Sequence, residues 1–124
     1  MPEPSADQPP LEAIAALATA IRAALAPVPD AADVVGLAYA AEPASVRTLG
    51  SLGGWVARAG VDTDARQAAT DLLVHHVIGS VAVEHNDRLV RGLDGNHAGR
   101  SAADVATSFE VGLGIILRGL ATVR

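Results

Sequence analysis

Apolar residues in this chain recur at the spacing of amphipathic helices. Over residues 9–26 they are separated by steps of three and four, which places one stripe on a single helix face: Leu11, Ile14, Ala18, Ile21 and Leu25. Pro9 and Pro10 suit the first turn of this helix, and Pro27 ends it. No segment alternates apolar and polar residues as a half-buried strand does, so the sequence predicts an all-α fold.

Two shorter helices are expected next. Asp30 is the predicted N-cap of a helix within residues 31–42, where Asp33 favours the positive end of the helix dipole. A third helix is expected over residues 43–60, with Gly60 as its C-cap.

The two longest helices close the chain. The first of these helices is expected to begin at a cap at Asp62 or Thr63 and to end near residue 86. Between Leu72 and Val83 this helix is apolar on nearly every side, which indicates burial on more than one face. A turn at residues 94–96 leads into a final helix over about residues 103–122. The prediction is a single domain of about five helices over residues 9–124, after a proline-rich leader, residues 1–8, that is expected to be disordered.

Composition and charge then exclude several function classes. The net charge of −5 and the pI of about 5.1 argue against nucleic-acid contact by this chain, and the absence of cysteine excludes disulfides, thiolate metal sites and a cysteine nucleophile. No run of 18 apolar residues suggests a membrane span, and the acidic, proline-rich N-terminus is unlike a signal peptide. We expect a soluble cytoplasmic protein.

The candidate chemical residues give no catalytic constellation. Glu84, His85, Asp87, Asp94 and His97 match no metalloprotease or EF-hand spacing and are interpreted as a solvated helix end and loop. Neither serine in the long helices lies in a G-x-S-x-G context, and "GSLGG" (50–54) follows no strand. The sequence therefore predicts no enzyme, no cofactor and no metal site.

The adjacent histidines of the long helix leave three interpretations open. His75 and His76 point about 100° apart, so both cannot bind one metal ion, although Asp71 and His75 are four residues apart and can. The other interpretations are a hydrogen-bonded histidine in the core or a pocket, and a histidine on the helix surface or at an interface.

Aromatic and small residues indicate a pocket and a close helix contact. Tyr39 and Trp55 are two of only three aromatic residues, and each belongs either to the core or to the wall of an apolar ligand pocket. Gly112 and Gly119 are seven residues apart on one helix face, and the preceding helix carries Gly79 beside Ser80. Two interpretations are open. Glycine is common throughout this chain, or these small residues let two helices pack closely onto a second copy as an intermolecular four-helix bundle.

Three segments, in this order, resemble the C-terminal ligand-binding and dimerisation domain of TetR-family transcriptional regulators. "LEAIAALATAIRAAL" (11–25) resembles the helix that opens that domain, and "AGVDTDARQAATDLLVHHVIGSVAVE" (59–84) its long helix with a central small step. "SFEVGLGIILRGLATV" (108–123) is similar to its closing helix.

The resemblance implies a homodimer with an unidentified small apolar or aromatic effector bound in a helical cavity. The implied ligand-binding residues are Tyr39, Leu52, Trp55, Leu72, His75 and His76. The implied dimer interface is Gly79, Val83, Phe109, Gly112, Leu113, Ile116 and Gly119.

The family's helix-turn-helix is expected before residue 11, where this sequence has ten proline-rich residues. The chain is then a truncated regulator, a free-standing sensor or the product of a late gene start. The expected function is effector sensing and dimerisation in a transcriptional regulator, a repressor or an activator. The alternative is a structural dimerisation partner that binds no ligand and can inactivate a full-length relative by forming a heterodimer with it.

Overall fold

The computed structural model describes residues 4–42, 47–93 and 100–124. Within these residues the predicted all-α fold is confirmed, with helices and no strand. The elements are α1 (Pro10–Leu25), α2 (Ala31–Ala41), α3 (Arg47–Arg58), the 3-10 turn η2 (Thr63–Ala65), α4 (Arg66–Leu93) and α5 (Ala102–Thr122).

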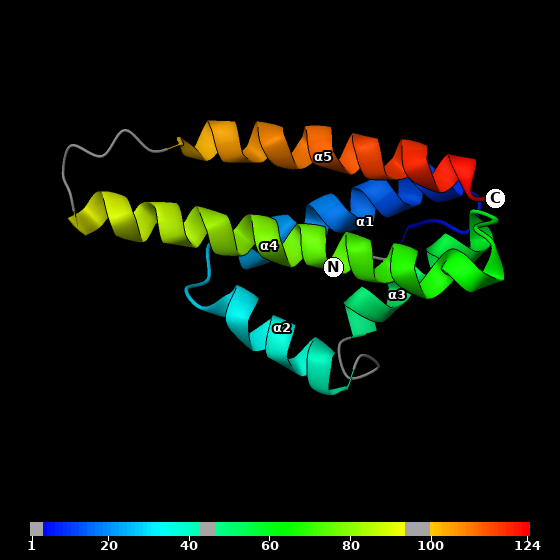
Figure 1. Ribbon diagram of the computed structural model, residues 1–124, viewed down its shortest axis with the longest axis horizontal. Coiled ribbons are helices and arrows are strands. Elements are labelled where there is room, and N and C mark those ends of the chain that lie inside the picture. Colours follow the sequence, from blue (N-terminus) through cyan, green and yellow to red (C-terminus); the bar gives the residue numbers. More distant parts are fainter. Residues whose placement is uncertain (1–3, 43–46, 94–99) are drawn as a thin grey trace.

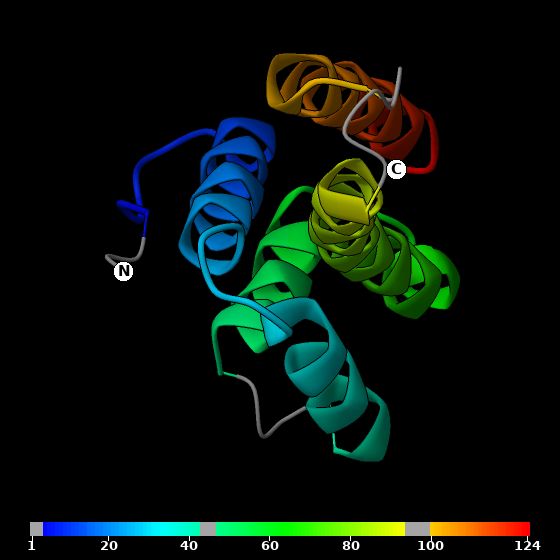
Figure 2. The same cartoon turned by 90° about the vertical axis from the view of Figure 1, so that its left-hand side faces the viewer.

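Helix α4 is the centre of the fold, because it packs against each of the other four α-helices. Figure 1 shows α4 and α5 side by side along the long axis of the molecule. In the end-on view of Figure 2, α1, α3 and α2 lie to one side of the α4–α5 pair, and no described helix covers the opposite side.

The core lies between α1, α3, α4 and α5. The apolar stripe predicted for α1 is buried there, and α3 contributes Leu49, Leu52, Trp55 and Val56. Leu73, Val74 and Val77 of α4 meet this cluster, as do Phe109, Leu113 and Leu120 of α5. The backbone N–H of Asp62 donates to the Val123 carbonyl (2.8 Å), which joins the end of α5 to the segment before α4.

Several helix ends differ from the predictions. Helix α4 continues to Leu93 instead of ending near residue 86, and it begins at Arg66 after η2 with no side-chain cap from Asp62. Asp30 does precede α2, but in the left-handed region (φ 62°) and without a side-chain cap bond. Gly60 has the positive φ of +83° expected of a C-cap glycine. The predicted turn at residues 94–96 and the predicted start of the third helix at residues 43–46 lie outside the described residues.

A capping box begins α5. The Asp104 N–H donates to Ser101 Oγ (3.1 Å), and the Ser101 N–H donates to Asp104 Oδ2 (3.3 Å). These hydrogen bonds lower the pKa of the Asp104 carboxyl. The pattern S-x-x-D before an apolar run was readable in the sequence and places the start of the helix.

Part of the leader that was expected to be disordered contacts α3. The Ala6 carbonyl accepts a hydrogen bond of 2.7 Å from the Arg58 guanidinium, which also lies 4.0 Å from the centre of the Trp55 ring. Ala6 is thus joined to the end of α3 by this hydrogen bond, although Ser5, Ala6 and Asp7 are exposed.

Helix α5 is unusually apolar for its exposure. It is the one described helix that is long and apolar enough to cross a membrane, judged by length and composition alone, and only 22% of its apolar window is buried. Its buried side chains keep one face on α1 and α4, so the remaining apolar residues face outward.

Candidate functional site

A cavity of about 530 Å³ lies between α2 and the first half of α4. We call it the Asp71 cavity. Helix α2 provides Gly36, Tyr39 and Ala40, and α4 provides Gln67, Asp71, His75, Ile78 and Gly79. The α4 residues share a wall because steps of three and four return to the same side of a helix.

A hydrogen-bonded triad forms the polar part of this cavity. The Tyr39 hydroxyl and the Gln67 side-chain amide each donate to Asp71 Oδ1 at 2.9 Å. Burial raises the pKa of the Tyr39 phenol, and its hydrogen bond to Asp71 and the negative charge of Asp71 raise it further. The phenol therefore remains a neutral donor.

The structure brings two of the six predicted ligand-binding residues, Tyr39 and His75, to this cavity. Leu52 and Trp55 lie in the core instead, because the inward face of α3 packs on α1 and α4. Leu72 is 50% exposed on the outer side of α4, and His76 points toward α5. Asp71 and Gln67 were absent from the predicted set; the successive spacing of four from Gln67 to Asp71 and from Asp71 to His75 was the available signal.

His76 is held between α4 and α5 by two contacts with Phe109. The rings stack with centroids 4.9 Å apart and planes 9° from parallel, and His76 Nε2–H donates to the Phe109 carbonyl (2.9 Å). Gly112 makes room for this ring, since a Cβ atom at that position would lie 2.6 Å from His76 Cε1. The close approach that the sequence assigned to a second copy is thus an approach within the chain.

A buried ion pair joins α1 to α4. Arg22 of α1 donates to Ser80 Oγ (3.1 Å), lies 3.6 Å from Glu84 and sits over the Phe109 ring. Glu84 also pairs with Arg88 at 3.2 Å and is only 7% exposed, so its interpretation as part of a solvated helix end is wrong. The reason is the length of α4, which places Glu84 mid-helix against α1.

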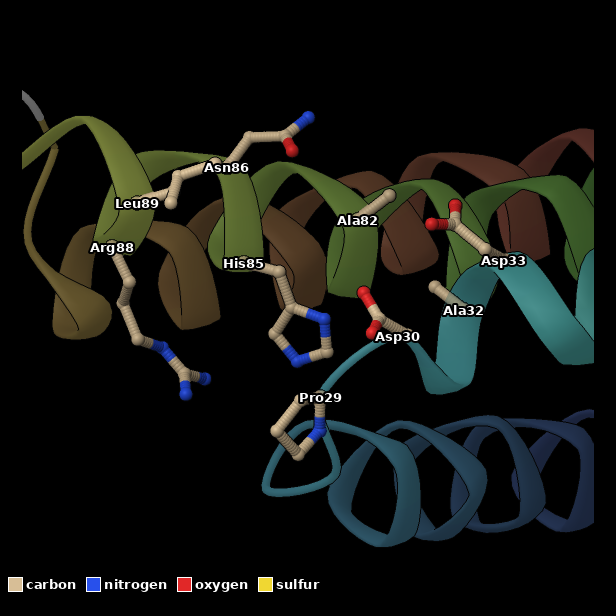
Figure 3. A pocket seen from close by; sticks show the side chains of 9 residues that line it. All are labelled: Pro29, Asp30, Ala32, Asp33, Ala82, His85, Asn86, Arg88 and Leu89. Carbon is tan, nitrogen blue, oxygen red and sulfur yellow. The ribbon is translucent and has the colours of Figure 1, made fainter.

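A second cavity, of about 430 Å³, lies between the start of α2 and the C-terminal half of α4 (Figure 3). Asp30 and His85 point toward one another in it, but His85 Nε2–H and the Arg88 guanidinium both donate to the Ala26 carbonyl, at 2.8 and 3.1 Å. These two side chains cap the C-terminal end of α1, which accounts for them structurally. Asp94 and His97 lie outside the described residues.

The outer side of the α4–α5 pair carries exposed apolar residues on both helices. Leu72 and Val83 project from α4, and Val111 and Ile115 from α5, each at least 44% exposed. We call these four residues the α4–α5 face. A groove of about 160 Å³ runs along the helix pair, lined by Gly79 and Val83 of α4 and by Ser108 of α5 among others.

The predicted interface residues fall on different sides of the two helices. Phe109 and Leu113 are buried in the chain's own core, and Ile116 packs against it. Gly112 lies under His76, whereas Gly79, Val83 and Gly119 lie toward the open side; a Cβ at Gly79 or Gly119 would meet no atom within 4 Å. The predicted interface is therefore divided: Val83 belongs to the α4–α5 face and Gly79 lines the groove beside it, whereas Phe109 and Leu113 are core residues.

The described residues contain no group of three or more His, Cys, Asp or Glu side chains placed to hold a metal ion. Asp71 and His75 alone do not make such a site. No family model, curated protein or solved structure matches the chain.

Proposed function

We propose that this chain is the effector-sensing and dimerisation domain of a TetR-like transcriptional regulator, acting in the cytoplasm as a homodimer. The observation that carries the proposal is the α4–α5 face: two antiparallel helices lie side by side with large apolar side chains exposed on both, and Figure 2 shows no described helix covering the outer side of the pair. A protein that is monomeric in water rarely leaves such a stripe open.

The size of this face suits a second copy of the chain. Helix α5, with 21 residues, is about 30 Å long, and two helices side by side are about 20 Å wide, which gives roughly 600 Å² per subunit. Specific dimers bury about 800 Å² per partner, so the face and its rim are of the right order. A twofold axis across the face would make a four-helix bundle from two α4–α5 pairs.

The position of the Asp71 cavity supports a sensing role. Gly79 lines both this cavity and the groove on the α4–α5 face, so effector and partner subunit would contact one short stretch of α4 from two sides. An effector that binds one packing of the two subunits more tightly than another shifts the population toward it. The regulation of transcription is inferred on this basis together with the resemblance in sequence.

The dimer is tested by light scattering after gel filtration at micromolar concentration. We expect twice the 12.5 kDa mass of the chain for the wild type and a monomer for Ile115→Glu, which places a charge in the middle of the face. Leu37→Glu is the matched control, because Leu37 is 73% exposed on α2, away from the face, and should leave the dimer intact.

A monomeric wild type would contradict the proposal. Co-sedimentation of the chain with lipid vesicles, without self-association, would instead assign the apolar side of α5 to a membrane. A dimer that binds no small molecule in the Asp71 cavity would favour the structural dimerisation partner.

A further inference from the structure

The Asp71 carboxylate has hydrogen-bond donors but no cationic partner in the described part of the chain. Tyr39 and Gln67 both donate to Oδ1, and no described residue donates to Oδ2. The two ion pairs of Glu84 lie on the other side of α4. No arginine lines the Asp71 cavity, and the chain has no lysine.

The rest of the cavity wall is mainly apolar. Ala40, Ile78 and two glycines line the cavity together with Tyr39, and His75, which also lines it, is exposed. A single carboxylate fixed at the side of an apolar hollow attracts a positive charge more strongly than the same group in open water, because the surrounding dielectric is lower.

We propose that the effector of the Asp71 cavity is a small organic cation, with a protonated amine that binds Asp71 and an apolar or aromatic body that packs on Tyr39 and Ile78. This proposal rests on the proposed function, since it specifies the ligand class of the same cavity. Tyr39 and Gln67 hold the carboxylate in place, so Asp71 presents its free oxygen without first having to be ordered.

A matched set of three probes tests the charge preference: 2-(1-naphthyl)ethylamine, 2-(1-naphthyl)ethanol and 3-(1-naphthyl)propanoate. They carry the same ring and differ in the charge of the end group. Binding is followed by NMR of the ¹⁵N-labelled chain, so that shifted amides locate the site at residues 36–40 and 67–79. We expect the amine to bind about tenfold or more tightly than the alcohol, as a charge-assisted hydrogen bond predicts, and the carboxylate probe most weakly.

Asp71→Asn is the decisive variant, because the amide oxygen still accepts from Tyr39 while the negative charge is lost. It should reduce amine affinity to that of the alcohol and leave alcohol affinity within about twofold of wild type. Asp33→Asn removes an equal charge at the other cavity and should change neither. Folding of both variants is checked by their NMR spectra.

The outcomes separate the two proposals. Equal binding of amine and alcohol at these residues would overturn the cation preference while leaving an effector cavity in place. Tighter binding of the carboxylate probe, or an unchanged amine affinity in Asp71→Asn, would also overturn it. No binding of any probe at millimolar concentration would overturn the cation proposal and, with an intact dimer, would remove the sensing role as well.

Discussion

Gly112→Ala offers a sharp test of the contact between α4 and α5. In an exposed helix position this change gains about 1 kcal/mol of stability from helix propensity. Here the new Cβ would lie 2.6 Å from His76 Cε1, so the imidazole must leave its place. It would then lose a ring stack worth about 1 kcal/mol and a hydrogen bond worth about 1 kcal/mol net. The expected result is a net loss of about 1 kcal/mol.

The sign should reverse when the histidine is absent. In a His76→Ala background the added methyl group meets no imidazole, so Gly112→Ala should stabilise the chain by about 1 kcal/mol. The coupling between the two sites is then about 2 kcal/mol. Gly50→Ala is the control, because its Cβ would meet nothing within 4 Å and the change should stabilise in both backgrounds.

Urea unfolding followed by fluorescence measures these values, since Trp55 is the only tryptophan and is buried. All variants are compared at one protein concentration, because self-association adds to apparent stability. A Gly112→Ala variant that is more stable than the wild type with His76 present would refute the contact.

Three further predictions concern the triad, the ion pair and the core. Tyr39, the only tyrosine, should titrate above pH 10 by ultraviolet absorbance, and Asp71→Asn should lower the pKa of its phenol. Because the pKa of the Tyr39 phenol is raised in the folded state, the stability that this group contributes is complete below pH 10 and is lost as the pH rises through the raised pKa. Glu84→Gln leaves Arg22 buried without its ion-pair partner and should cost about 3 kcal/mol in urea unfolding, whereas a cost below about 1 kcal/mol would contradict a buried pair. Leu52→Ala should cost about 2–5 kcal/mol because Leu52 is fully buried, yet the folded variant should bind the naphthyl probes like the wild type; a changed probe affinity would place Leu52 on the cavity wall after all.

The sequence was sufficient to locate the helices along the chain, but not to predict which neighbour the apolar side of each helix packs against. Steps of three and four between apolar residues located α1 and α5 to within a residue or two, since an amphipathic stripe needs only local spacing to be recognised. Which neighbour each stripe meets depends on packing. Phe109 and Leu113 were assigned to a second copy because nothing local distinguishes a core stripe from an interface stripe, and the structure buries both within the chain.

Leu72 to Val83 shows why a helix that is apolar on several sides is hard to interpret from sequence. Consecutive residues of α4 turn by about 100°, so Asp71, Leu72 and Leu73 face the cavity, the outer side and the core respectively. The sequence indicated burial on more than one face, and α4 does pack against four helices, but within the described chain the side that carries Leu72 and Val83 stays exposed. The uncovered side is the feature that a second copy would complete.

This threefold division of α4 gives the proposed sensor a physical means of coupling. Because one rigid helix carries the cavity, the core contacts and the outer face, it cannot rotate at Asp71 without moving Leu72 as well. The ion pair of Arg22 with Glu84 and the stack of His76 on Phe109 tie the same helix to α1 and α5, so such a rotation must reorganise those contacts. A ligand that pulls Asp71 toward the cavity would therefore act on the α4–α5 face through α4 itself, and a variant that loosens His76 should weaken the effect of the ligand on dimer affinity without preventing its binding.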